Sequence, residues 1–179
     1  IKFSLTEIEK MAITLEQLLL LARLDANNAN DQSSTIPLTS IINESLGRLN
    51  KSIVEKALKV DLVFNENDKL LVPLFYTQLI IENLLSNSIK YSKENSTIEI
   101  NIAVINKHVV CSIKDSGIGI SKNDLKHIYD SFFRSDALNH KNITGNGLGL
   151  SIVKKCAEAI NAKVEIESLL GQGTTVTIK

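Results

Sequence analysis

The placement of glycine is the feature that most constrains how this chain can fold. Of the eight glycines in 179 residues, all except Gly47 lie between positions 117 and 173. Glycine lets the backbone turn sharply and lets a ligand or another segment approach closely. The pattern predicts three tight loops and excludes collagen-like and low-complexity chains. The three sets of glycines are Gly117 and Gly119; Gly145, Gly147 and Gly149; Gly171 and Gly173.

Composition excludes several further classes of protein. The chain has 20 basic and 20 acidic residues, so it has no overall attraction for nucleic acid or acidic lipid. Cys111 and Cys156 match neither a metal-binding spacing nor a disulfide framework, which predicts a reducing compartment. We find neither a signal peptide nor an apolar stretch of the ~18 residues that span a bilayer. The sequence opens at Ile1 within a helical pattern, so we expect it to be part of a longer protein.

Residues 1–27 are predicted to form a helix of a coiled coil or bundle. Apolar residues recur every three or four positions for about three heptads. We favour a helix that packs with a partner chain, and a core helix of the same domain is the alternative. Residues 28–36 are polar and predict a linker, so one domain is expected over residues 37–179. The apolar seam comprises Ile1, Leu5, Ile8, Ala12, Leu15, Leu19 and Ala22.

The remaining sequence mixes helical and strand periodicities. Helical spacing predicts helices over residues 38–54, 74–91, 121–129 and 147–160. Alternation of apolar and polar residues predicts half-buried strands, and a tight turn is expected at Asn106–Lys107. Together these elements predict an α+β fold in which helices cover one face of a sheet. The strands are expected near residues 60–64, 70–72, 98–104, 109–113, 163–168 and 174–178.

The helix predicted over residues 74–91 carries an unusual polar face. Asn83, Asn87 and Lys90 fall within about 60° of one another on a helix that turns 100° per residue. Asparagine is a poor helix former, so this arrangement needs a reason. Amide oxygens suit Mg²⁺ and an ammonium group suits phosphate, whereas the alternative is an ordinary solvated face. The apolar face, expected on the sheet, comprises Leu74, Ile81, Leu85 and Ile89.

A second motif follows the strand that ends near Ile113. Asp115 opens a turn in which Gly117 and Gly119 permit the close approach of a ligand. An aspartate in this place can accept a hydrogen bond from an exocyclic amine, and the alternative is a tight strand-to-helix turn. Thr174, on the last strand, should point inward, where its hydroxyl group needs a polar partner.

A third motif opens the last predicted helix. Glycines at a helix N-terminus expose free N–H groups that bind anions. The polar residues 134–144 exclude a Rossmann motif, and the absence of Lys-Ser/Thr excludes a P-loop. Residues 134–146 are expected to act as a mobile lid. Phe132 and Phe133 would anchor this lid and Arg134 would reach a terminal phosphate, whereas the alternative is a buried aromatic pair beside a surface arginine.

The order and spacing of these motifs resemble the ATP-binding catalytic domain of sensor histidine kinases. The resemblance rests on Asn83–Ser92, Asp115–Ser121 and Gly145–Ser151 and covers residues 37–179. Residues Glu16–Asp25 resemble the end of the second helix of that family's dimerisation and phosphoacceptor hairpin. The implied fold is a two-layer α/β sandwich of the Bergerat type, with a mixed sheet and ATP held between the helices and a lid.

The resemblance implies ATP and Mg²⁺ as cofactors and gives each site residue a role. Asn87 would ligate Mg²⁺ beside Asn83, and Lys90 and Tyr91 would contact the phosphates or the ribose. Arg134 would meet the γ-phosphate, so the implied catalytic residues are Asn87, Lys90 and Arg134. The other residues implied in binding the adenine or the phosphates are Asp115, Gly117, Gly119, Gly145, Gly147, Leu148, Gly149 and Thr174.

The implied reaction transfers the γ-phosphate of ATP to a histidine of the dimerisation domain in a homodimer. An aspartate of a response regulator would then receive the phosphoryl group, and no nucleic acid is involved. The implied location is the cytoplasmic part of a bacterial sensor anchored in the inner membrane. Neither His108, His127 nor His140 has the family's acceptor pattern, a histidine before an acidic residue on an amphipathic helix. The acceptor is therefore expected upstream of Ile1, and this chain alone is not expected to autophosphorylate.

Two alternatives remain open on sequence grounds. The first is another ATPase of the same superfamily, in which a catalytic glutamate lies on the Asn-rich helix, and Glu82 is the candidate here. The second is a degenerate module that binds a nucleotide without catalysis. A smaller departure is Asn161–Ala162, which stands where the kinase family usually has a glycine-rich turn.

Overall fold

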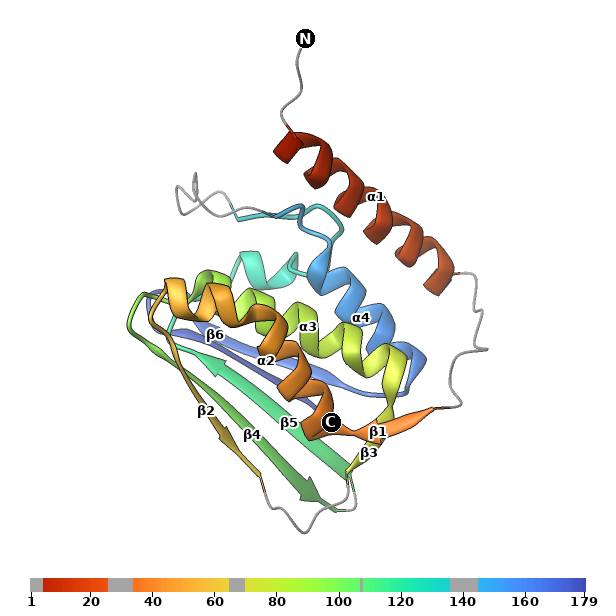
Figure 1. The fold of residues 1–179 in the computed structure, drawn as a ribbon, viewed down its shortest axis with the longest axis vertical. Helices are drawn as coiled ribbons and strands as arrows, with labels where there is room; N and C mark the ends of the chain where they lie inside the picture. The colour runs from red at the N-terminus through yellow and green to blue at the C-terminus, as the bar shows by residue number, and fades with distance from the viewer. Residues whose placement is uncertain (1–4, 26–33, 65–69, 107, 136–144) are drawn as a thin grey trace.

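The computed structural model describes residues 5–25, 34–64, 70–106, 108–135 and 145–179, which form a sheet covered by helices (Figure 1). In chain order the elements are α1 (Leu5–Asp25), β1 (Thr35–Pro37), α2 (Leu38–Glu55), β2 (Lys59–Val63), β3 (Leu71–Pro73), α3 (Leu74–Tyr91), β4 (Thr97–Ile105), β5 (His108–Asp115), a 3₁₀ turn (Asp124–Lys126), α4 (Gly149–Ala159), β6 (Val164–Leu169) and β7 (Gly173–Ile178).

The five-stranded sheet is mixed and has the order β2-β4-β5-β7-β6. Strands β2 and β4 are parallel, and the other neighbours are antiparallel. Helices α2, α3 and α4 lie over one face of this sheet, and α1 lies across α4 on the side away from the sheet (Figure 1). The predicted α+β class and two-layer arrangement are therefore confirmed. Strands β1 and β3 form a separate small antiparallel pair.

The core lies between the sheet and the helices. The register aligns one apolar residue from each of four neighbouring strands, so a continuous row runs beneath the helices. The predicted alternation in β4 is confirmed at Ile98, Ile100 and Ile102, which are buried, whereas Val104, expected on the same face, is 43% exposed near the end of the strand. The row consists of Ile100, Ile113, Val176 and Ile166.

Helix α3 is the central helix of the layer. Its predicted apolar face is confirmed at Ile81, Leu85 and Ile89, which are almost inaccessible to solvent, whereas Leu74 at the N-terminus is half-buried. Ile80 and Leu84 are buried as well, because α2 and α4 pack against the two sides of α3. This flanking explains why more of the helix is apolar than one amphipathic face requires.

Two local predictions need comment. The helix expected over residues 121–129 is wrong, because the segment contains a 3₁₀ turn at Asp124–Lys126. Most of its backbone bonds span three residues, as from His127 N–H to the carbonyl oxygen of Asp124, and a single bond, from Leu125 N–H to Ser121, spans four as in an α-helix. At the glycine-poor turn, Asn161 adopts a φ of 54°, a conformation that asparagine tolerates better than most residues. Lys107 of the expected hairpin turn lies outside the described residues.

Both cysteines are free thiols in the core. Burial raises the pKa of Cys111 and of Cys156 to about 12, so neither is reactive near neutral pH. Among the described residues, no helix combines the length and apolar character required to cross a bilayer.

Gly47 gives a test of the fold that is independent of any ligand. It lies inside α2, and a methyl group added there would have no heavy atom within 4 Å. Gly47→Ala should raise the free energy of unfolding by about 0.5–1 kcal/mol, because alanine loses less conformational entropy in a helix. Denaturant titration would measure the change. Gly117→Ala is the contrasting variant, since its methyl group would lie 2.5 Å from the carbonyl oxygen of Tyr91. A lower midpoint for Gly47→Ala would contradict the helical environment of residue 47.

Candidate functional site

A pocket lies between α3, the inner face of the sheet and the segment around residues 118–135. Apolar side chains from both layers line much of it, and its polar lining includes Asn87, Asp115, Arg134 and Thr174. The lining is suited to a flat apolar ring system that carries polar substituents. Its apolar members include Leu84, Ile118, Ile120, Leu150, Ile166 and Val176.

Asp115 is a buried carboxylate at the end of β5. Its Oδ1 accepts hydrogen bonds from the backbone N–H groups of Gly117 at 2.8 Å and Thr174 at 3.2 Å. Burial raises the pKa of Asp115, and these two backbone hydrogen bonds oppose that shift. Both bonds use Oδ1, so the carboxylate is held in one orientation while Oδ2 can accept a bond from a ligand.

The inward orientation predicted for Thr174 is confirmed, and its hydroxyl group has the polar partner that burial requires. Thr174 Oγ1 and Ser168 Oγ lie 2.9 Å apart on the paired strands β6 and β7. Ser168 Oγ also accepts a hydrogen bond from the N–H group of Ile120 at 2.8 Å. Sequence reasoning missed Ser168, although pairing the two strands across Gly171 would have placed it opposite Thr174.

The turn after Asp115 packs directly against the end of α3. A methyl group at Gly117 would lie 2.5 Å from the Tyr91 carbonyl oxygen, so glycine is required by this close approach. The N–H group of Ile118 donates to the same oxygen at 3.2 Å, and Ser92 forms a β-bridge with Gly117. On its other side, Gly119 contacts the backbone of Leu169, a contact that leaves no room for a side chain.

The polar face of α3 points toward the N-terminus of α4. A methyl group at Gly149 would lie 3.0 Å from Asn83 Oδ1 and 3.7 Å from Asn87 Nδ2. Asn83 Nδ2 donates to the carbonyl oxygen of Leu79 at 2.8 Å, which fixes the direction of its amide oxygen. Asn87 lines the pocket itself. The structure thus brings together the two amides and the glycine predicted at a helix N-terminus.

Lys90 and Arg134 meet at the start of the glycine loop. Arg134 Nη1 donates to the carbonyl oxygen of Gly145 at 3.0 Å, and a methyl group at Gly145 would overlap the ammonium group of Lys90. Burial lowers the pKa of Lys90, and the nearby Arg134 lowers it further. Lys90 Nζ also lies 5.5 Å from the ring centre of Tyr91. Two neighbouring cations would be stabilised by an anion between them.

The base of the expected lid is well defined. The carbonyl oxygen of Gly147 accepts a hydrogen bond from Phe132 N–H at 3.0 Å, so the outgoing and returning strands of the loop lie side by side. Gly147 has a φ of 74°, and a methyl group there would lie 2.7 Å from the backbone of Phe133. Residues 136–144, which include most of the predicted lid, lie outside the described residues. Leu148 is fully buried in the core, so only its backbone could contact a ligand.

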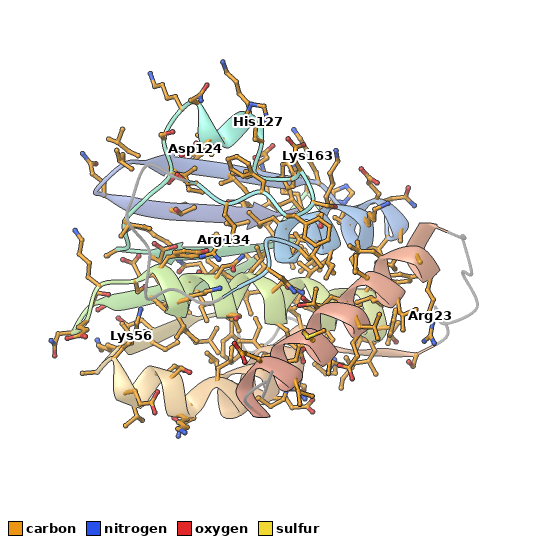
Figure 2. All side chains as sticks on the ribbon, turned by 90° about the horizontal axis from the view of Figure 1, so that it is seen from above. Arg23, Lys56, Asp124, His127, Arg134 and Lys163 are labelled. Carbon is orange, nitrogen blue, oxygen red and sulfur yellow. The ribbon has the colours of Figure 1, made fainter. Side chains whose placement is uncertain are left out.

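In the view of Figure 2, from above, α1 passes over part of the helical layer. Asn146 Nδ2 donates to Gln17 Oε1 and, at 3.4 Å, to Thr14 Oγ1, both on α1. Sequence reasoning missed this contact, because nothing in the local pattern pairs residues so far apart. It brings the glycine loop into direct contact with the N-terminal helix.

Glu82 faces away from the site. Its Oε1 accepts hydrogen bonds from Arg48 of α2 and, at 3.0 Å, from Gln78. A general base must reach the proton that it removes, and Glu82 is instead engaged on the α2 side of α3. This geometry disfavours the alternative in which Glu82 activates water.

Comparison with known proteins identifies the family of the chain. Residues 76–179 match the family described as histidine kinase-, DNA gyrase B- and HSP90-like ATPases. The chain belongs to this family. The matched region is thus an ATP-binding domain, and it includes all three glycine sets and the Asn-rich face of α3.

Relatives narrow the assignment within the family. The signal transduction histidine-protein kinase ArlS of Staphylococcus aureus is 29% identical over 178 residues, which are 99% of this chain and 39% of ArlS. The chain thus spans about two fifths of the length of this curated relative. Its sequence relatives support the assignment of the chain as the ATP-binding catalytic domain of a sensor histidine kinase.

Solved structures share the fold. ShkA, solved at full length with AMPPNP, has a TM-score of 0.79 at 20% identity over 99% of this chain and 39% of its own. Acinetobacter baumannii AdeS has a TM-score of 0.78 at 18% identity over 97% of this chain and 79% of its own. The cytoplasmic segment of QseC has a TM-score of 0.62 at 22% identity over 100% of this chain and 97% of its own. The expected two-layer ATP-binding fold is confirmed.

The lowered pKa of Lys90 predicts a pH-dependent affinity for ATP. Its ammonium group loses its proton at a lower pH than an ordinary lysine, so the affinity for ATP should fall at alkaline pH, before an ordinary lysine would lose its proton. Lys90→Met should bind ATP about tenfold more weakly near neutral pH and lack this dependence. Calorimetric titration across the pH range would measure both. Lys114→Met is the matched control, because Lys114 pairs with Glu99 on the sheet; an equal pH response in Lys90→Met would contradict the assignment.

Proposed function

We propose that this chain is the catalytic part of a sensor histidine kinase that transfers the γ-phosphate of ATP to a histidine of a dimerisation domain. An aspartate of a response regulator then receives the phosphoryl group. The observation that carries the proposal is the convergence of Asn87, Lys90 and Arg134 on the glycine loop that opens α4, beside a pocket that ends at Asp115.

In this proposal, different residues bind the adenine and the phosphates of ATP, at two ends of the pocket. Asp115 accepts a hydrogen bond from the adenine amine through Oδ2, and Thr174 assists from the adjacent strand. At the other end Lys90, with Tyr91 beneath it, binds the phosphates or ribose, and Arg134 binds the γ-phosphate. Positioning and charge neutralisation supply most of the catalysis in phosphoryl transfer, and both need only groups of this kind.

The side-chain amides of Asn83 and Asn87 on α3 are suitable ligands for a Mg²⁺ ion bound together with the nucleotide. Mg²⁺ prefers oxygen ligands and usually keeps waters and substrate phosphates in its coordination shell. Asn87 would supply an amide oxygen, with the amide oxygen of Asn83 beside it. Among the described residues, no group of three His, Cys, Asp or Glu could hold a metal alone, so phosphate oxygens would complete the shell. The metal would neutralise charge on the transferred phosphate.

We also propose that α1 is the end of a dimerisation helix within residues 1–27, with a linker over 28–36 and the catalytic domain over 37–179. The last two residues of this linker, Thr35 and Ile36, belong to β1 and pair with β3 of the domain. The described seam residues support this division. Ile8, Leu15 and Leu19 are 54%, 59% and 52% exposed, whereas Leu21 on the side facing the domain is 7% exposed. A helix that leaves its heptad positions in solvent has an apolar face suited to a second copy of itself.

The proposed location is the cytoplasmic part of a bacterial sensor anchored in the inner membrane. Support comes from QseC, whose cytoplasmic segment matches this chain over nearly the whole length of both. A neutral net charge is compatible with a partner that is neither nucleic acid nor membrane surface.

Removal of the proposed metal ligand tests the mechanism. Asn87→Ala should slow Mg²⁺-dependent phosphoryl transfer about 100-fold or more, because an oxygen ligand is lost. The measurement follows labelled phosphate from ATP to a histidine-kinase phosphoacceptor hairpin supplied in trans. Asn87→Asp should retain more activity, and Ser86→Ala, an exposed neighbour on α3, is the matched control. A wild-type rate in Asn87→Ala would refute the metal assignment.

The same assay separates the alternatives. Steady hydrolysis of ATP without an acceptor hairpin would favour a different ATPase of the family. Binding of Mg-ATP without any transfer would favour a degenerate module.

The exposed seam predicts self-association through α1. Leu15→Lys should weaken dimerisation at least about tenfold, because it buries a charge in an apolar interface. Sedimentation equilibrium would compare it with Glu16→Lys, which changes an exposed residue outside the seam. A wild-type chain that stays monomeric at high concentration, or equal association of all three proteins, would contradict the dimerisation role.

A further inference from the structure

Lys56 joins the ends of two helices. It is the residue directly after α2, and its Nζ donates to the carbonyl oxygens of Ile89 at 2.9 Å, Lys90 at 2.7 Å and Ser92 at 3.0 Å. The last carbonyl groups of a helix lack partners within the helix. The ammonium group has three donors, and all three are matched here by oxygens at the C-terminal end of α3.

The backbone around Lys56 is fixed by hydrogen bonds to the residues that follow α3. The carbonyl oxygen of Lys56 accepts a hydrogen bond from Asn95 N–H at 3.0 Å, and Lys59 N–H donates to the carbonyl oxygen of Ser96 at 2.9 Å. Ala57 has a φ of 49°, an unfavourable conformation for a residue other than glycine that the surrounding contacts maintain. The side chain of Lys56 is thus half-buried and directed at α3 by structure on both sides of it.

The turn of α3 that Lys56 holds also carries the nucleotide site. Lys90 is one of the three residues whose carbonyl oxygens bond the Lys56 ammonium group. The carbonyl oxygen of the next residue, Tyr91, accepts a hydrogen bond from Ile118 N–H. Ser92, also bonded, bridges to Gly117, whose N–H group holds Asp115 Oδ1. A continuous series of backbone contacts therefore links the ammonium group to both the adenine end and the phosphate end of the pocket.

We propose that Lys56 is a positioning residue of the nucleotide site, which fixes the last turn of α3 and thereby the placement of Lys90 and Asp115. The inference rests on the proposed function only in that the pocket binds ATP. A positive charge at the C-terminus of α3 also complements the negative end of the helix dipole. Burial lowers the pKa of Lys56, whereas Glu94 raises it, so the group is placed at some cost in desolvation.

Adenosine and ATP together distinguish this role from that of a phosphate-binding residue. Lys56→Met should weaken the binding of both ligands about tenfold, because loss of the bonds displaces the turn that holds Asp115. Lys90→Met should weaken the binding of ATP more than the binding of adenosine, because adenosine lacks the phosphates. Lys56→Arg should give an intermediate loss of about threefold for adenosine, since a planar guanidinium group matches three convergent carbonyl oxygens less well.

Two controls separate positioning from a general loss of stability. Lys51→Met removes an exposed lysine of α2, and Ile53→Val lowers stability by shortening a half-buried side chain in the same helix. Both should bind adenosine and ATP as the wild type does, while chemical denaturation reports the stability of each variant. If Lys56→Met does not fold, the adenosine affinity of Lys56→Arg tests the inference.

Wild-type affinity for adenosine in a folded Lys56 variant would overturn the inference. So would an equal loss of affinity in Ile53→Val at matched stability. A wild-type chain that bound neither ligand would overturn the proposed function as well, so the two failures are distinguishable.

Discussion

The contact between the end of α3 and the turn after β5 is the constraint on which the site depends. The Tyr91 carbonyl oxygen and Gly117 approach so closely that a side chain has no room, and the N–H group of Ile118 bonds the same oxygen. One element of this contact carries Lys90 and the other carries the buried Asp115. Because both are fixed at a single backbone junction, the separation of these two residues is set by the fold.

Glycine has two functions in this arrangement. At Gly147 it supplies a backbone conformation with positive φ, and at Gly117 it supplies space. Gly119 and Gly173 likewise let backbone segments meet, whereas Gly145 and Gly149 face the side chains of Lys90 and Asn83. Gly47 lacks such a contact, which is why its replacement addresses helix stability alone.

The sequence was most informative where local periodicity and burial coincide. The predicted bounds of α3 agree with the structure, and the alternation in β4 identified its buried face, because one side of each packs on the core. The sequence did not predict the side chains that bond segments far away in the chain. Lys56 and Ser168 are ordinary residues in their local context, and their roles follow from pairing with segments distant in sequence. The 3₁₀ turn after Asp124 was missed because too few residues are available for a longer helix to form.

The glycine loop is the place where the nucleotide site and the N-terminal helix meet. Asn146 donates to two side chains of α1, and its own Oδ1 accepts a bond from Leu148 N–H at 3.3 Å. The residue before it, Gly145, is bonded by Arg134. A ligand that shifts this loop must therefore either carry α1 with it or lose the bonds to Asn146. By linkage, any such cost couples the position of α1 to the binding of that ligand, and the coupling acts equally in both directions.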